Sequence, residues 1–146
     1  MPVERLTEDL LRHIIAASSP DEYLAEGETM DRSLSDYLFD LLRERGIKRA
    51  DVVRASGLHQ TVVYDIFSGK SYPGRDNAIM LAFGLGCDLV ETQRLLRLAG
   101  VSELWPKVRR DAIVIWSIKE GLSREECDDE LYRLNEKTLF PVRDDA

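Results

Sequence analysis

Few residues in this sequence have side chains suited to catalysis or metal binding, and they form no recognisable motif. The two cysteines, Cys87 and Cys127, lie forty positions apart without a CxxC pair, so we expect ordinary thiols rather than a metal site or a disulfide. The two histidines, His13 and His59, belong to no ligand motif, and the chain has no nucleophile elbow or glycine-rich phosphate loop. We therefore expect neither an enzyme nor a bound cofactor or metal.

The remaining polar chemistry is that of charge and hydrogen bonding, and the charge is unevenly distributed. The formal net charge of −7 argues against a simple nucleic-acid binder. Residues 43–75, however, contain seven basic and three acidic side chains, whereas 1–42 and 76–146 are both net negative. The basic residues of this stretch are Arg43, Arg45, Lys48, Arg49, Arg54, Lys70 and Arg75. A single positive island inside an acidic chain indicates one surface suited to phosphate.

The composition is that of a globular protein, with 44% hydrophobic and 32% charged residues. No stretch approaches the ~20 consecutive apolar residues of a membrane span, and the first residues lack the apolar core of a secretory leader. We expect a cytoplasmic protein without a membrane partner.

Apolar residues recur with a helical period along almost the whole chain, which predicts an all-α protein of about eight helices. We expect three parts: an acidic N-terminal helical extension (1–30), a central domain (31–100), and a C-terminal helical pair with a tail (101–146). In the extension, Ser19 is expected to cap a helix that Gly27 ends, followed by an exposed acidic connection over 26–31.

The C-terminal part is expected to hold a helix from Pro106 to Lys119 and a last helix capped by Ser123. Trp105 and Trp116 are the residues expected to pack this pair onto the central domain. The tail from Pro141 to Ala146 is expected to fray.

Residues 49–69 have the pattern of a helix-turn-helix, which needs two short helices joined by a tight turn. Gly57 suits the turn because glycine adopts positive φ without steric cost. Val53 precedes it by four positions, and Val63 and Ile66 follow it by six and nine. This spacing predicts that the three apolar side chains share one small core with the glycine at the turn.

The segment from Gly57 through Ser68-Gly69 resembles the phage lambda repressor and Cro family, in its turn, its third helix and its closing Phe-polar-Gly. The loop Gly69-Lys70-Ser71-Tyr72-Pro73 is similar to a Gly-Lys-x-x-Pro stretch common after that helix in bacterial regulators. The resemblance covers about 33 to 99 and implies a lambda-repressor-like five-helix domain. Arg49 departs from the family's usual glutamine, and Val53 from its usual alanine.

This resemblance implies that the third helix enters the major groove of double-stranded DNA with its N-terminal residues at base edges. The implied base contacts are Gln60, Thr61, Tyr64 and Asp65. Glutamine offers a donor and an acceptor suited to adenine, and the threonine methyl can meet a thymine methyl. The implied phosphate contacts are Lys48, Arg49, His59, Lys70 and Arg75.

Two functions remain open at this point. The first is a sequence-specific DNA-binding transcriptional regulator, acting as a homodimer on a two-fold operator. The second is a protein-interaction or adaptor module that keeps the helix-turn-helix scaffold, for example antitoxin-like or a signalling partner, and binds a protein through its acidic flanks. A positive face over the third helix would favour DNA, and an acidic face there would favour a protein.

Overall fold

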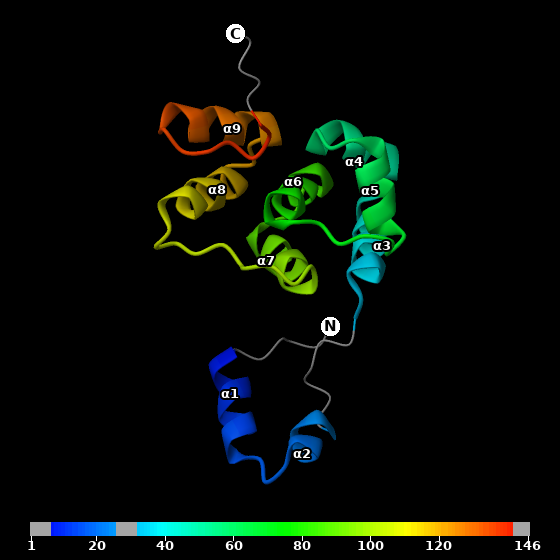
Figure 1. The fold of residues 1–146 in the computed structure, drawn as a ribbon, viewed down its shortest axis with the longest axis vertical. Helices are drawn as coiled ribbons and strands as arrows, with labels where there is room; N and C mark the ends of the chain where they lie inside the picture. Colours follow the sequence, from blue (N-terminus) through cyan, green and yellow to red (C-terminus); the bar gives the residue numbers. More distant parts are fainter. Residues whose placement is uncertain (1–6, 26–31, 142–146) are drawn as a thin grey trace. The chain divides into compact units, whose positions relative to one another are not determined.

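The computed structural model describes residues 7–25 and 32–141, and within these ranges the only regular secondary structure is helical. The chain divides into two compact units, Met1–Asp31 and Arg32–Ala146. Figure 1 shows the helices of both. The fold class expected from the sequence, all-α, is confirmed for these residues. The connection expected over 26–31 and the frayed end over 142–146 lie outside the described residues.

The first unit contains α1 (Thr7–Ala16) and α2 (Pro20–Ala25). The start of α2 is as predicted, since Ser19 Oγ accepts from the Glu22 amide at 3.2 Å and Pro20 is the first helical residue. The end expected at Gly27 lies outside the described residues. Leu11, Ile14 and Ile15 of α1 are at least half exposed.

The second unit contains α3 (Leu34–Arg45), α4 (Arg49–Ser56), α5 (Gln60–Phe67), α6 (Arg75–Leu85), α7 (Leu89–Leu98), α8 (Arg109–Lys119) and α9 (Arg124–Arg133). In Figure 1, α6 and α7 occupy its middle, with α3, α4 and α5 to one side and α8 and α9 to the other. The junction near residue 100, expected between the central domain and the helical pair, lies inside this unit.

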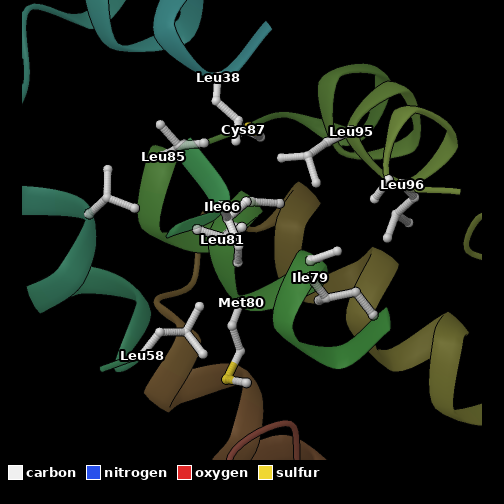
Figure 2. Packing of buried hydrophobic residues seen from close by; sticks show 14 of the residues in the cluster. Leu38, Leu58, Ile66, Ile79, Met80, Leu81, Leu85, Cys87, Leu95 and Leu96 are labelled. Carbon is white, nitrogen blue, oxygen red and sulfur yellow. The ribbon is translucent and has the colours of Figure 1, made fainter. Parts of the chain in front are cut away.

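Helix α6 is the centre of the core because it is buried on nearly every side. Its buried residues are Ala78, Ile79, Met80, Leu81, Ala82, Gly84 and Leu85. Figure 2 shows Leu81 beside Ile66 of α5, with Leu85 and Leu38 toward one end of the cluster and Met80 toward the other. A helix that is apolar all round belongs inside a protein, so α6 is the scaffold on which the other helices of the unit pack.

One glycine in α6 allows α4 to approach closely. A Cβ atom placed on Gly84 would lie 2.9 Å from the Cβ of Ser56 and 3.0 Å from the carbonyl oxygen of Val52. Val52 is fully buried, whereas Val53 is only partly buried at the edge of the core. The interior position of α4 is therefore Val52, and Val53 is less central than its spacing predicted, since α4 faces α6 as well as α5.

The C-terminal helices are joined to α6 by two neighbouring ion pairs of opposite polarity. Arg75 binds Asp111 at 2.7 and 3.0 Å, and the next residue, Asp76, accepts from Arg110 at 2.9 and 3.2 Å. Asp111 is 3% exposed and also accepts from the amide of Trp105 at 3.0 Å. These contacts fix the first turn of α8 against the first turn of α6.

Two expectations for this part of the chain were wrong. Helix α8 begins at Arg109, with Val108 and not Pro106 at its start. Trp105 and Trp116 are 60% and 48% exposed, so they do not pack the helical pair onto the domain. The reason is the orientation of α8: Asp111 faces α6, and at 3.6 residues per turn Trp116 points to a different side.

Candidate nucleic-acid interface

Helix α4 and the turn after it are built by short-range hydrogen bonds. The backbone N–H of Lys48, the N-cap residue, donates to the Asp51 carboxylate at 2.9 Å. At the other end Gly57 adopts the left-handed region, with φ of 80°, and its N–H donates to the Val53 carbonyl at 3.2 Å. The turn thus has the glycine and the backbone conformation that the sequence predicted.

Helix α5 begins directly after this turn, with His59 as its N-cap. The Nδ1 atom of His59 accepts from the Thr61 amide at 3.2 Å. A neutral imidazole that accepts at Nδ1 carries its proton on Nε2, so the outer nitrogen of His59 is a hydrogen-bond donor. His59 itself is exposed.

The inner side of α5 fixes which residues face outward. Val63, Ile66 and Phe67 are buried, and the Phe67 carbonyl accepts from the Ser35 hydroxyl of α3. Gln60 and Thr61 are consequently exposed at the first turn, and Tyr64 and Asp65 are half-buried one turn later. The four residues expected to contact bases lie on two consecutive turns of one helix.

Tyr64 is engaged with a cation from the neighbouring helix. The guanidinium carbon of Arg49, the first residue of α4, lies 4.5 Å from the centroid of the Tyr64 ring. This is a cation–π contact. Arg49 remains exposed and forms no ion pair with any residue in 7–25 or 32–141. The positive charge of Arg49 therefore lies beside α5 and is not neutralised by a carboxylate of the described residues.

The basic island contains fewer available cations than its composition indicated. Arg43, Arg45, Arg54 and Arg75 pair with Asp40, Glu91, Asp51 and Asp111 respectively. Lys48, Arg49 and Lys70 are exposed and pair with no acid among the described residues. The Lys70 amide donates to the Asp65 carbonyl at 2.9 Å, which keeps the start of its loop beside the end of α5.

The guanidinium of Arg75, expected to contact phosphate, is bound within the fold. Besides Asp111, its guanidinium donates to the carbonyl oxygens of Ser102 at 3.0 Å and Glu103 at 2.9 Å. These bonds occupy the donors that a phosphate contact would need, and Arg75 joins α6 to α8 instead.

The sequence reading missed Arg124, the first residue of α9. A Cβ atom on Gly57 would lie 3.0 Å from Nη2 of Arg124, so this guanidinium covers the turn between α4 and α5. Arg124 also binds Asp128 at 2.6 Å and lies over the ring of Phe140. No local signal in the sequence links positions 57 and 124.

Other chemistry is sparse in the part of the chain that the structure describes. There, no group of three or more His, Cys, Asp or Glu residues is arranged to hold a metal ion, and no helix is long and apolar enough to cross a membrane. Both thiols are buried. Burial raises the pKa of Cys87 to about 12 and that of Cys127 to about 11.

Comparison with family models, with curated proteins and with solved structures finds no match for this chain.

Proposed function

We propose that this protein is a sequence-specific DNA-binding transcriptional regulator that reads the major groove with α5. The observation that carries the proposal is the exposure of Gln60 and Thr61 at the first turn of α5, directly after the left-handed turn at Gly57. In this proposal α3 to α7 are the five helices of a lambda-repressor-like domain, and α4 and α5 are its helix-turn-helix; the order and short lengths of these helices support it. We propose that the chain is similar to that family in function as well as in this segment.

Base recognition in this proposal starts from the two exposed polar residues. The amide of Gln60 can pair with N6 and N7 of adenine, and the methyl group of Thr61 can meet that of thymine. Asp65 lies one turn deeper and can accept from N4 of cytosine. Together these groups prefer some base pairs over others, which is what a regulator requires.

Phosphate binding in this proposal uses three exposed cations, Lys48, Arg49 and Lys70, and the Nε2 atom of His59. Lys48 and Arg49 stand at the start of α4, and Lys70 follows the end of α5, so they flank the proposed reading helix. Stacking on Tyr64 reduces the freedom of the Arg49 side chain before DNA arrives. Arg75 is left out of this set because its guanidinium is occupied within the fold.

The test is selection of binding sites from randomised duplex DNA, followed by affinity measurements at several salt concentrations. Gln60→Ala is expected to cost about 1–3 kcal/mol and to relax the preference at one position. Lys70→Ala is expected to weaken all sequences alike and to lower the salt slope by about 1. Arg54→Ala is the matched control, because Arg54 is an exposed cation of α4 already paired with Asp51. Wild-type protein that selects no sequence and shows no salt-dependent affinity would refute the proposal.

One observation favours the alternative, a protein-interaction module. Arg124 brings the start of α9 to the turn at Gly57, and α9 carries Glu125, Glu126, Asp128, Asp129 and Glu130. In this alternative an acidic surface beside the helix-turn-helix binds a basic protein. Wild-type protein that binds no duplex, while Glu125→Lys abolishes capture of a basic partner, would establish it.

A further inference from the structure

The outer face of α8 carries an apolar strip with a positive end and a negative end. Ala112, Ile113 and Trp116 form the strip, Arg109 lies at its start and Glu120 at its end. At 3.6 residues per turn, residues eleven apart return to almost the same side of a helix, so Arg109 and Glu120 lie on one line about 16 Å apart. Trp116 is 48% exposed in the middle.

The strip forms one wall of a shallow groove. A hollow of about 330 Å³ runs between α8 and α9, lined by Arg109, Ala112, Ile113 and Trp116 on one side and by Glu130, Arg133 and Leu134 on the other. Arg109 donates to the Leu134 carbonyl at 2.9 Å and approaches Glu136 at 3.5 Å, yet its side chain is 60% exposed. Glu120, the C-cap residue of α8, is exposed and pairs with no cation within the described residues.

Two antiparallel copies of this strip are complementary to each other, because the positive end of one lies beside the negative end of the other. If two copies of α8 run antiparallel about a two-fold axis, Arg109 of one copy faces Glu120 of the other at both ends. The midpoint of positions 109 and 120 is also the midpoint of 113 and 116, so each Ile113 then faces a Trp116. We infer that the occupant of this groove is a second copy of the chain and that α8 is its dimer helix.

This inference rests on the proposed function for its biological use, since a dimer reads a two-fold operator, but its structural basis is separate. The apolar strip supplies area, because Trp116 is still 48% exposed and an aromatic side chain buries about 150–250 Å² when it is covered completely. The two ion pairs supply register and antiparallel direction, since charged pairs contribute more to specificity than to affinity. A parallel pairing would place like charges together at each end.

The experiment is sedimentation equilibrium of the full chain without DNA, over a range of protein concentration. Wild type is expected to be a dimer that dissociates on dilution. Arg109→Glu and Glu120→Arg are each expected to weaken the dimer about tenfold or more, because each places two like-charged pairs across the axis. The double variant Arg109→Glu/Glu120→Arg restores both pairs in reverse and is expected to recover most of the wild-type affinity.

Two further variants separate the apolar strip from general effects. Trp116→Ala is expected to weaken the dimer at least as strongly as either charge reversal. Trp105→Ala and Lys107→Glu are the matched controls, because both residues are exposed and lie before α8; neither is expected to change the association. Thermal unfolding of every variant is the control for retention of the fold.

Three results would overturn the inference. The first is a wild-type protein that remains monomeric at concentrations up to about 100 μM. The second is a dimer that Trp116→Ala leaves unchanged. The third is a double variant no stronger than the single ones. DNA binding by the same variants is measured separately: a DNA-binding protein without this dimer refutes only the inference, and a dimer without DNA binding refutes only the proposed function.

Discussion

The guanidinium of Arg75 and the carboxylate of Asp111 form a bidentate ion pair, with N–O distances of 2.7 and 3.0 Å, between the first turns of α6 and α8. The pair crosses thirty-six positions of sequence and lies beside the second pair, Asp76 with Arg110. Because Asp111 is buried and Arg75 is 28% exposed, the interaction is partly shielded from water. It ties the C-terminal helices to the domain that carries α5.

Asp111→Ala is expected to lower the free energy of unfolding by about 2–3 kcal/mol, since it leaves a partly buried guanidinium without its charge partner. Urea unfolding followed by circular dichroism measures the loss. Arg54→Ala serves as the control, because it removes a pair with Asp51 in which the arginine is 69% exposed, and such pairs contribute at most about 1 kcal/mol. Equal losses for the two variants would contradict the structural role given to Asp111.

The same pair predicts how stability depends on pH. Burial acts to raise the pKa of Asp111, but the hydrogen bonds from Arg75 and the Trp105 amide, with the nearby arginine charges, outweigh burial and lower it. A carboxyl group with a lowered pKa in the folded state stabilises the fold above its unfolded pKa of about 3.9, and this contribution disappears as the pH falls through the folded pKa. The stability difference between wild type and Asp111→Asn is expected to be constant above about pH 5 and to shrink below about pH 4. A difference that grows on acidification would contradict this assignment.

The sequence predicted those features that depend on residues a few positions apart. The turn at Gly57 and the helix starts at Ser19 and Ser123 are where the sequence placed them, because Gly57 adopts the left-handed region after α4 and each serine hydroxyl accepts from the amide three residues on. The all-α class followed from the same local period. These are properties of short segments, which periodicity and capping describe well.

The features that were missed depend on contacts between distant segments. Arg75 reads as one more cation of the basic island, since its partner Asp111 belongs to another helix. Val52 and Val53 both read as inward residues of α4, whereas the packing of α4 on α6 buries Val52 fully and leaves Val53 only partly buried. The exposure of Trp116 follows from the orientation of α8, in which Asp111 faces α6. The candidate site was therefore predictable for α5 itself and not for its surroundings.

The contact between Arg49 and Tyr64 predicts a coupling within the proposed DNA surface. Arg49→Ala and Tyr64→Ala are each expected to weaken operator binding by about 1 kcal/mol or more, and their double variant by less than the sum, because the ring positions the guanidinium. Tyr64→Phe keeps the ring face and is the matched control, expected to bind nearly as wild type. Strictly additive losses in fluorescence anisotropy titrations would show that the two residues act independently.

The position of Arg124 over Gly57 predicts a difference between two similar glycines. Gly57→Ala and Gly46→Ala both place a side chain at positive φ, with φ of 80° and 62°, which costs about 1–2 kcal/mol. Nothing lies within 4 Å of a Cβ at Gly46, whereas at Gly57 it meets the guanidinium at 3.0 Å. Thermal unfolding is expected to show the larger loss for Gly57→Ala, and an Arg124→Ala background is expected to reduce the gap. If the two glycine variants lose the same stability in the wild-type background, Arg124 does not restrain the turn.

Gly84→Ala tests whether the close approach of α4 to α6 positions α4 and the proposed reading helix α5. Alanine is favoured over glycine inside a helix by about 1 kcal/mol, so propensity alone predicts a more stable protein. The structure predicts the opposite sign. The added Cβ would lie 3.0 Å from the Val52 carbonyl oxygen and 2.9 Å from Ser56 Cβ, and α4 must move because these atoms belong to or adjoin its backbone. Overpacking of this kind typically costs about 1–3 kcal/mol.

The matched control is Gly74→Ala at the N-cap of α6, where φ is −67° and nothing lies within 4 Å of the new Cβ. It is expected to change stability by less than Gly84→Ala does. Because Lys48 and Arg49 stand at the start of α4, a shift of α4 also moves these two cations relative to Gln60 and Thr61 of α5. Gly84→Ala is therefore expected to weaken operator binding even at temperatures where the variant is fully folded, while Gly74→Ala binds as wild type. A Gly84→Ala protein that is more stable than wild type and binds equally well would show that the contact between α4 and α6 has room for a methyl group.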